Sequence, residues 1–393
     1  MSETEYSTLK LERLPVPVAS IGALLVAVCI AAGISDKSEF FQSYLVAYLF
    51  WLGITLGCLA VLMIQHLTGG QWALVIRRIL EAGTRTLPLM AVAALPLLLG
   101  MKTLYIWSQP GQSDPAILGK RLYLNPDFFF ARMVFYFAAW FLLSHFFNKW
   151  SREEDSEGNP AVWLRIENLS GIGLVIYGLT VTFASVDWVM SLEPRWYSTI
   201  YGMLFMVGQA LAAMAFAITV LIWLSDRKPL SQFVKPAHFQ DLGSFLLAFV
   251  MLWAYLQFSQ FLIIWGGNLT EEIPWYLRRM QGVWGHVGLL LVILNFALPF
   301  FLLLFRHVKR RTRSLLIVAG MVLMLRMVDM FWMVLPAFGG GNARLTWMNV
   351  ALPLGFGAIW FAYFTWQLQR MPILPLHDPR MEGVTQHAAA EHG

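Results

Sequence analysis

The chain has 393 residues, of which 58% are hydrophobic and only 13% are charged. Soluble domains carry roughly 25% charged residues, so this composition excludes a soluble globular protein and predicts a multi-pass membrane protein. The net charge of +5 does not indicate a nucleic-acid partner, because basic residues in membrane proteins usually record orientation. Cys29 and Cys58 lie singly in apolar segments, which excludes a disulfide framework and a cysteine-ligated metal or iron–sulfur site.

Ten apolar segments follow a polar N-terminal segment (1–15) that lacks the pattern of a signal peptide. Each is close to the roughly 20 residues that a helix needs to cross a bilayer. They are 16–34, 42–65, 86–107, 128–147, 168–187, 198–224, 242–265, 283–305, 314–335 and 346–368. The sequence therefore predicts an all-α, polytopic integral membrane domain over 16–368, followed by an extended or disordered tail at 369–393.

A short turn at 188–197 divides this domain into a first half (16–187) and a second half (198–368). Pro194 cannot continue a helix, and the neighbouring tryptophans and tyrosines suit the boundary between hydrocarbon and water. Most Lys and Arg residues fall in loops on the opposite side from this turn. By the positive-inside rule, both termini are expected in the cytoplasm, and the turn forms an outward interfacial hairpin. Its charges are Asp187, Glu193 and Arg195.

Two charged segments fall on the expected cytoplasmic side. The segment 66–85 interleaves apolar residues with Arg77, Arg78 and Glu81, which predicts a short amphipathic helix lying on the inner membrane surface. The linker 149–167 is the most charged part of the chain, and we expect its acidic residues only to keep the connection in water. These residues are Glu153, Glu154, Asp155 and Glu157.

One outward loop, 266–281, has the composition of an ordered interfacial element that a partner protein could contact. Two acidic residues are followed by an aromatic stretch and then by two arginines. The candidate partner contacts are Glu271, Glu272, Trp275, Arg278 and Arg279.

The ninth segment carries two ionisable residues near the middle of the membrane, Arg326 and Asp329. An ionisable residue at that depth is costly and is a functional candidate by default. Residues three apart share a helix face, so a same-helix ion pair is one interpretation. The other makes Asp329 a proton-relay group held ionised by Arg326. Either way, removing one partner leaves the other charge at low dielectric.

Other polar groups gather in the expected outer half of the membrane, which predicts a polar pocket or half-channel open to the outside. Each could instead be a satisfied hydrogen bond of the core. The candidates for a proton pathway are Asp187, Glu193, His286, Arg326, Asp329 and Lys102. On the seventh segment, Trp253, Gln257 and Gln260 share a face and form a candidate quinol pocket. No metal site is expected, and the depths of the histidines do not suit bis-histidine haem.

Three stretches together carry a family resemblance. They are His-Leu-Thr-Gly-Gly-Gln-Trp at 66–72 running on to Arg77-Arg78, Asp-Trp-Val-Met-Ser-Leu-Glu-Pro at 187–194, and Gln-Phe-Leu-Ile-Ile-Trp-Gly-Gly-Asn-Leu at 260–269 with Glu-Glu-Ile-Pro-Trp-Tyr at 271–276. In these stretches the chain resembles the second large membrane subunit of bacterial alternative complex III. That complex is a quinol:cytochrome c oxidoreductase, and the subunit belongs to the NrfD-like, polysulfide-reductase membrane-anchor superfamily.

The resemblance implies two four-helix bundles with flanking helices, in the bacterial inner membrane. It also implies a homologous quinol-binding membrane subunit, a periplasmic iron–sulfur subunit and multihaem cytochrome c subunits as partners, with a terminal oxidase in oxidase-linked forms. Haem c and iron–sulfur clusters would then belong to those partners, and this chain would bind no cofactor beyond quinol or quinone. Relatives often have histidine where this chain has Arg195, so a titrating role is not expected there.

Three functions remain open from the sequence. The first is a redox-centre-free respiratory subunit that supports quinol oxidation and a proton pathway without being catalytic alone. The second is a purely structural subunit of the same complex. The third, a stand-alone secondary transporter, is disfavoured, because Pro96 and Pro299 do not occupy matched positions in the two halves.

Overall fold

The computed structural model describes residues 15–70, 72, 74–157, 160–339 and 345–375, and every regular element in these ranges is helical. Ten helices in the described part are long and apolar enough to cross a membrane. They are Pro15–Gly33, Lys37–Thr68, Arg77–Leu99, Pro126–Ser156, Ala161–Leu192, Tyr201–Ser225, Pro236–Gly267, Gly282–Leu304, Thr312–Ala337 and Met348–Leu368. The prediction of an all-α, polytopic membrane protein is confirmed. Of the predicted N-terminal segment (1–15) and tail (369–393), residues 1–14 and 376–393 lie outside the described residues. In the described part of the tail, Met371, Ile373 and Leu374 are buried, so the expectation of an extended or disordered tail is wrong for these residues.

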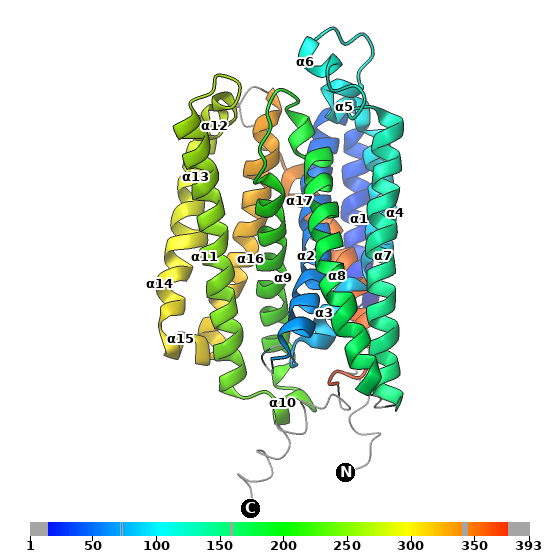
Figure 1. Ribbon diagram of the computed structural model, residues 1–393, viewed down its shortest axis with the longest axis vertical. Coiled ribbons are helices and arrows are strands. Elements are labelled where there is room, and N and C mark those ends of the chain that lie inside the picture. Colours follow the sequence, from blue (N-terminus) through cyan, green and yellow to red (C-terminus); the bar gives the residue numbers. More distant parts are fainter. Residues whose placement is uncertain (1–14, 71, 73, 158–159, 340–344, 376–393) are drawn as a thin grey trace, which may run out of the picture.

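By their packing contacts, the helices form two four-helix bundles with two flanking helices, and the two bundles lie side by side in Figure 1. The first bundle contains α2 (Lys37–Thr68), α4 (Leu87–Leu99), α7 (Pro126–Glu157) and α8 (Pro160–Trp188). The second contains α9 (Tyr201–Ser225), α11 (Pro236–Gly267), the continuous α13 (Gly282–Leu290), η5 (Leu291–Ala297) and α14 (Leu298–Leu304), and α16 (Thr312–Val334). Outside them, α1 (Pro15–Gly33) packs on α17 (Met348–Leu368), which packs on α2.

The two bundles meet where α2 packs along α9, and these two helices are the most deeply buried spans. Glycines on α2 allow the backbones to approach closely. A Cβ atom on Gly57 would lie 2.0 Å from the carbonyl oxygen of Gln209, so no larger residue fits there without moving α9. Residues of both bundles therefore contact each other along the α2–α9 interface in the middle of the protein.

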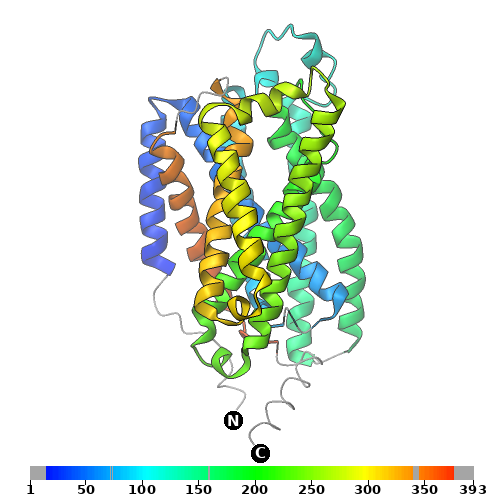
Figure 2. The same cartoon turned by 90° about the vertical axis from the view of Figure 1, so that its left-hand side faces the viewer.

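The two ends of the helical body differ in character (Figures 1 and 2). We call the end where α1 begins and α17 ends the terminal face; it also carries α10 (Leu230–Phe233) and α15 (Arg306–Arg310). We call the opposite end the loop face; it carries α5 (Met101–Leu104), α6 (Pro115–Leu118) and α12 (Ile273–Met280). The central hairpin lies at the loop face and contains the short helix η4 (Met190–Leu192).

The segment after α2 differs from its prediction. Helix α2 ends at Thr68 and is capped by Gly69 in the left-handed conformation (φ 63°), and the chain returns as α3 (Arg77–Thr84). All eight residues of α3 are buried, against α2, α17, α9 and α7. The prediction of an amphipathic helix on the membrane surface is therefore wrong, because the polar face of α3 meets charged residues of the chain and not water.

Helix α7 explains the burial of α3. It continues to Glu157, ten residues beyond the predicted end at 147, so that part of the expected linker is helical. Glu154 is 1% exposed, and it faces α3. The expectation that this acidic segment only solvates a connection is therefore wrong for Glu154 and for Asp155, which also binds α3.

Candidate functional site

Buried charges occur at three levels along the helical body, and the first lies beneath the loop face in the first bundle. Asp187, at the end of α8, is 1% exposed. Its two carboxylate oxygens accept hydrogen bonds from Nε and Nη2 of Arg132, both at 2.8 Å, and the Tyr136 hydroxyl donates a third at 2.7 Å. The Arg132 guanidinium also lies 3.8 Å from the centre of the Tyr123 ring. This bidentate pair fixes Asp187 in a fully hydrogen-bonded site.

A second group of charged side chains lies at the loop face, beside the second bundle. Glu193, in the hairpin, accepts hydrogen bonds from Arg278 and from Arg279, the latter at 2.9 Å. Arg279 is buried and also donates to the Met333 carbonyl at 2.8 Å. Burial lowers the pKa of Arg279, while the charge of Glu193 acts in the opposite direction. These bonds dock the hairpin onto α12 and the end of α16.

Aromatic stacking reinforces this docking. The Trp196 ring stacks on Trp275 with centroids 4.6 Å apart and an interplanar angle of 13°, and the Arg279 guanidinium lies 3.7 Å from the Trp275 centroid. Trp275 and Arg279 are thus enclosed within this chain, and the expectation that they contact a partner is wrong for these two. Of that predicted set, Glu271 is exposed, and Glu272 and Arg278 are partly exposed.

The middle level is the predicted pair on α16. Arg326 and Asp329 form an ion pair with side chains only 4% and 2% exposed. The guanidinium lies directly against α9, because a Cβ atom on Gly208 would be 2.1 Å from Nη2 of Arg326. Trp253 of α11 completes the surroundings, because its ring centre is 5.9 Å from the guanidinium carbon.

Gln209, next to Gly208 on α9, connects this pair with the first bundle. Its side-chain oxygen accepts a hydrogen bond of 2.7 Å from the Tyr177 hydroxyl of α8. It also lines two small cavities, one of about 20 Å³ that reaches Arg326 and one of about 10 Å³ that reaches Ser185. Cavities of this size are close to the minimum for a single water molecule. Polar groups of both bundles therefore meet at Gln209.

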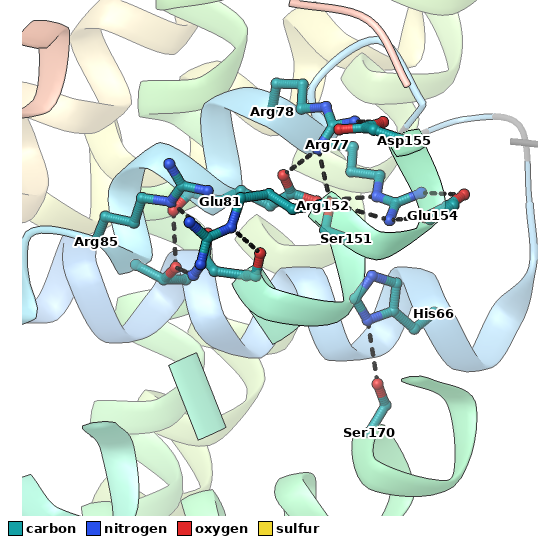
Figure 3. Close-up of polar contacts among 12 residues, drawn as sticks. His66, Arg77, Arg78, Glu81, Arg85, Ser151, Arg152, Glu154, Asp155 and Ser170 are labelled. Carbon is teal, nitrogen blue, oxygen red and sulfur yellow. Dashed lines mark hydrogen bonds and ion pairs between the residues drawn. The ribbon is translucent and has the colours of Figure 1, made fainter. Parts of the chain in front are cut away.

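The third level lies toward the terminal face, where Figure 3 shows charged residues of α3 and α7 interlocked. Arg77 donates to Glu81 at 3.0 Å and to Glu154 at 2.5 Å. Arg78 donates to Glu81 at 2.7 Å and to Asp155. The Ser151 hydroxyl lies among them, accepting from Arg78 at 2.6 Å and donating to Glu81 at 2.8 Å. We call Arg77, Arg78, Glu81, Ser151, Glu154 and Asp155 the α3–α7 cluster.

Two further polar contacts lie near the α3–α7 cluster. The Arg85 Nε donates to the Asn148 side-chain oxygen at 2.6 Å, which makes a second link between the end of α3 and α7. His66 of α2 pairs with the Ser170 hydroxyl of α8 at 3.1 Å (Figure 3). Sequence reasoning missed the cluster, although the spacing of Arg77 and Glu81, four residues apart, is a signal for an ion pair on a helix.

Apart from Trp253, which lies at the Arg326–Asp329 pair, the remaining predicted residues are not brought together at one site. Lys102 and His286 are exposed, and the His286 Nδ1 lies 2.9 Å from the Gly282 carbonyl of its own helix. Trp253 and Gln260 are buried, and Gln260 lies beside Tyr276, whereas Gln257 is partly exposed. In the described residues no three His, Cys, Asp or Glu side chains gather as metal ligands.

Compared with known proteins, the chain matches no protein-family model and no curated protein. The fold and the buried charges are therefore the basis on which a function can be argued. All three levels offer ionisable groups inside a membrane protein, where such groups either hold helices together or carry protons.

Proposed function

We propose that this chain is a redox-centre-free membrane subunit of a respiratory quinol:cytochrome c oxidoreductase of the alternative complex III type. In this proposal the loop face is periplasmic, and the terminal face is cytoplasmic. The chain supports quinol oxidation by its partners and provides part of a proton pathway. Its partners are a homologous quinol-binding membrane subunit, a periplasmic iron–sulfur subunit and multihaem cytochromes c, in the bacterial inner membrane.

The observation that carries the proton-pathway part is the Arg326–Asp329 pair. It is fully enclosed, it belongs to one bundle, and it approaches the polar groups of the other bundle through Gln209. A pair needed only to tie helices together would join two helices, but Arg326 and Asp329 are on the same helix. The cost of burying this pair is thus not offset by an ionic link between helices, which favours a role in charge transfer.

The observation that favours the structural alternative is the α3–α7 cluster. Two of its ion pairs, Arg77–Glu154 and Arg78–Asp155, join α3 to α7, and four of its five charged side chains are at most 1% exposed. Such a cluster fixes the position of α3 against the first bundle. We assign it to structure within the same proposed subunit, where it holds the bundle that carries Asp187.

Purification from native membranes in a mild detergent tests the assignment to a respiratory complex. The tagged protein should co-purify with an iron–sulfur subunit, identified by mass spectrometry, and the preparation should show the visible spectrum of c-type haem. The purified complex should also reduce cytochrome c or a linked acceptor with quinol. A colourless single polypeptide would instead favour a stand-alone transporter and would end this proposal.

A further inference from the structure

A large cavity at the loop face borders the networks described above through Tyr123 and Trp196. Its volume is about 470 Å³, and it lies between the end of α8, the hairpin and the segment 119–124. This volume is in the range of pockets that bind small molecules. The lining side chains that matter here are Lys120, Tyr123, Phe183, Val186, Met190 and Tyr197.

The apolar side of this cavity opens on the outer surface of the helical body. Phe183 lines it and is 48% exposed on a helix that crosses the membrane, and Leu122 at its edge is 94% exposed. Val186 of α8 and Met190 of η4 continue the same surface. Apolar side chains exposed at this position suit a hydrocarbon chain, since burying each CH₂ group contributes about 0.8 kcal/mol.

The polar rim of the cavity carries one charged side chain, Lys120. The Lys120 ammonium donates one hydrogen bond, of 2.6 Å, to the Pro194 carbonyl, and an ammonium has three N–H donors. Arg121 is exposed beside it, and Arg195 is 76% exposed and paired with Asp114. Neither arginine lines the cavity, although each is adjacent in the chain to a lining residue, so Lys120 is the basic group that a negatively charged ligand would meet there. Tyr197, within 5.7 Å of the Lys120 ammonium, is a residue type typical of the head-group level of a membrane.

We propose that this cavity binds an anionic phospholipid from the leaflet at the loop face. The acyl chain lies against Phe183, Val186 and Met190, and the phosphate lies at Lys120. The cavity also touches Tyr123, whose ring stacks on the Arg132 guanidinium and whose carbonyl oxygen accepts a hydrogen bond of 3.0 Å from Arg132. The bound lipid therefore supports the Asp187 site from outside.

Native mass spectrometry of the purified full-length chain with added phosphatidylglycerol or phosphatidylcholine tests this proposal. The wild-type protein should retain one phosphatidylglycerol more strongly than phosphatidylcholine. Lys120→Gln should lower phosphatidylglycerol retention about fivefold, the effect expected for one basic residue at an anionic head group. Val186→Trp should fill the cavity and lower retention of either lipid about tenfold or more.

Two control variants test whether a lost lysine or an added tryptophan outside the cavity also changes lipid retention. Lys37→Gln removes an exposed lysine at the same face, and Val175→Trp enlarges an exposed residue elsewhere on α8; neither residue lines the cavity. Both should retain lipid like the wild type. Equal retention of the two lipids by the wild type, unchanged retention in Lys120→Gln, or full displacement by inorganic phosphate would overturn the proposal. If Val186→Trp fails to fold, Lys120→Gln still tests the proposal, because Lys120 is exposed and its replacement leaves the core unchanged.

Discussion

Replacing Glu154 with glutamine would remove one of the carboxylates that surround Arg77 in the α3–α7 cluster. Both side chains are at most 1% exposed, and their closest nitrogen–oxygen distance is 2.5 Å. Breaking a buried ion pair costs about 3–5 kcal/mol, because the remaining charge stays at low dielectric. Arg77 keeps Glu81 at 3.0 Å, and glutamine keeps one acceptor oxygen, so we expect the lower end of that range, about 3 kcal/mol.

Denaturation of the purified protein in mixed detergent micelles, followed by circular dichroism, would measure this loss. Glu153→Gln is the matched control, because its side chain is 32% exposed and lies 3.9 Å from Lys149, which is 52% exposed. Such a surface pair contributes about 0–1 kcal/mol. If Glu154→Gln lowered the free energy of unfolding no more than Glu153→Gln, the cluster would not hold α3 in place, and the reasoning would be refuted.

Two further predictions concern the middle of the membrane and the loop face. Gly208→Ala should destabilise the protein by about 1–3 kcal/mol in the same assay, because the added carbon collides with Arg326, whereas Gly320→Ala, with open space around it, should be neutral or slightly stabilising. At the loop face, a backbone N–H of α6 and then Arg195 lower the pKa of Asp114. The folded-state pKa lies below the unfolded one, so this contact is present at neutral pH and is lost as the pH falls through the lowered pKa. Relative to the intrinsic rate at each pH, hydrogen exchange of the α6 amides should therefore speed up only below the ordinary aspartate pKa of about 3.9. Asp114→Asn should remove this pH dependence.

Much of the fold could be predicted from the sequence, because a span of about 20 apolar residues has few alternatives to a membrane helix. The Arg326–Asp329 pair could be predicted for a similar reason, since residues three apart on one helix face the same way. The burial of α3 could not. Its partner Glu154 lies 77 residues from Arg77 in the chain, and an amphipathic pattern does not say whether the polar face meets water or protein charges.

The positions of His286 and Trp275 also could not be predicted, because the sequence pattern does not say what each side chain faces. Helix α13 is apolar nearly all round, so hydropathy does not indicate which side faces the bundle, and His286 lies on the exposed side. Trp275 was expected to contact a partner because of its loop and its aromatic character. It is 2% exposed because Trp196, from a turn far away in the sequence, stacks on it. Such pairings depend on how the helices are arranged, which the hydropathy pattern does not specify.

The central claim is that Asp329 carries protons in a quinol-oxidising complex, and its most direct test is turnover and proton release by complexes containing Asp329→Asn. Asp127→Asn, at an exposed aspartate, is the matched control. We expect Asp329→Asn to assemble with its partners but to lose about tenfold or more in quinol-driven proton release, with the control unchanged. Normal proton release by an assembled Asp329→Asn complex would contradict the account, as would a variant whose only defect is a lower yield of complex.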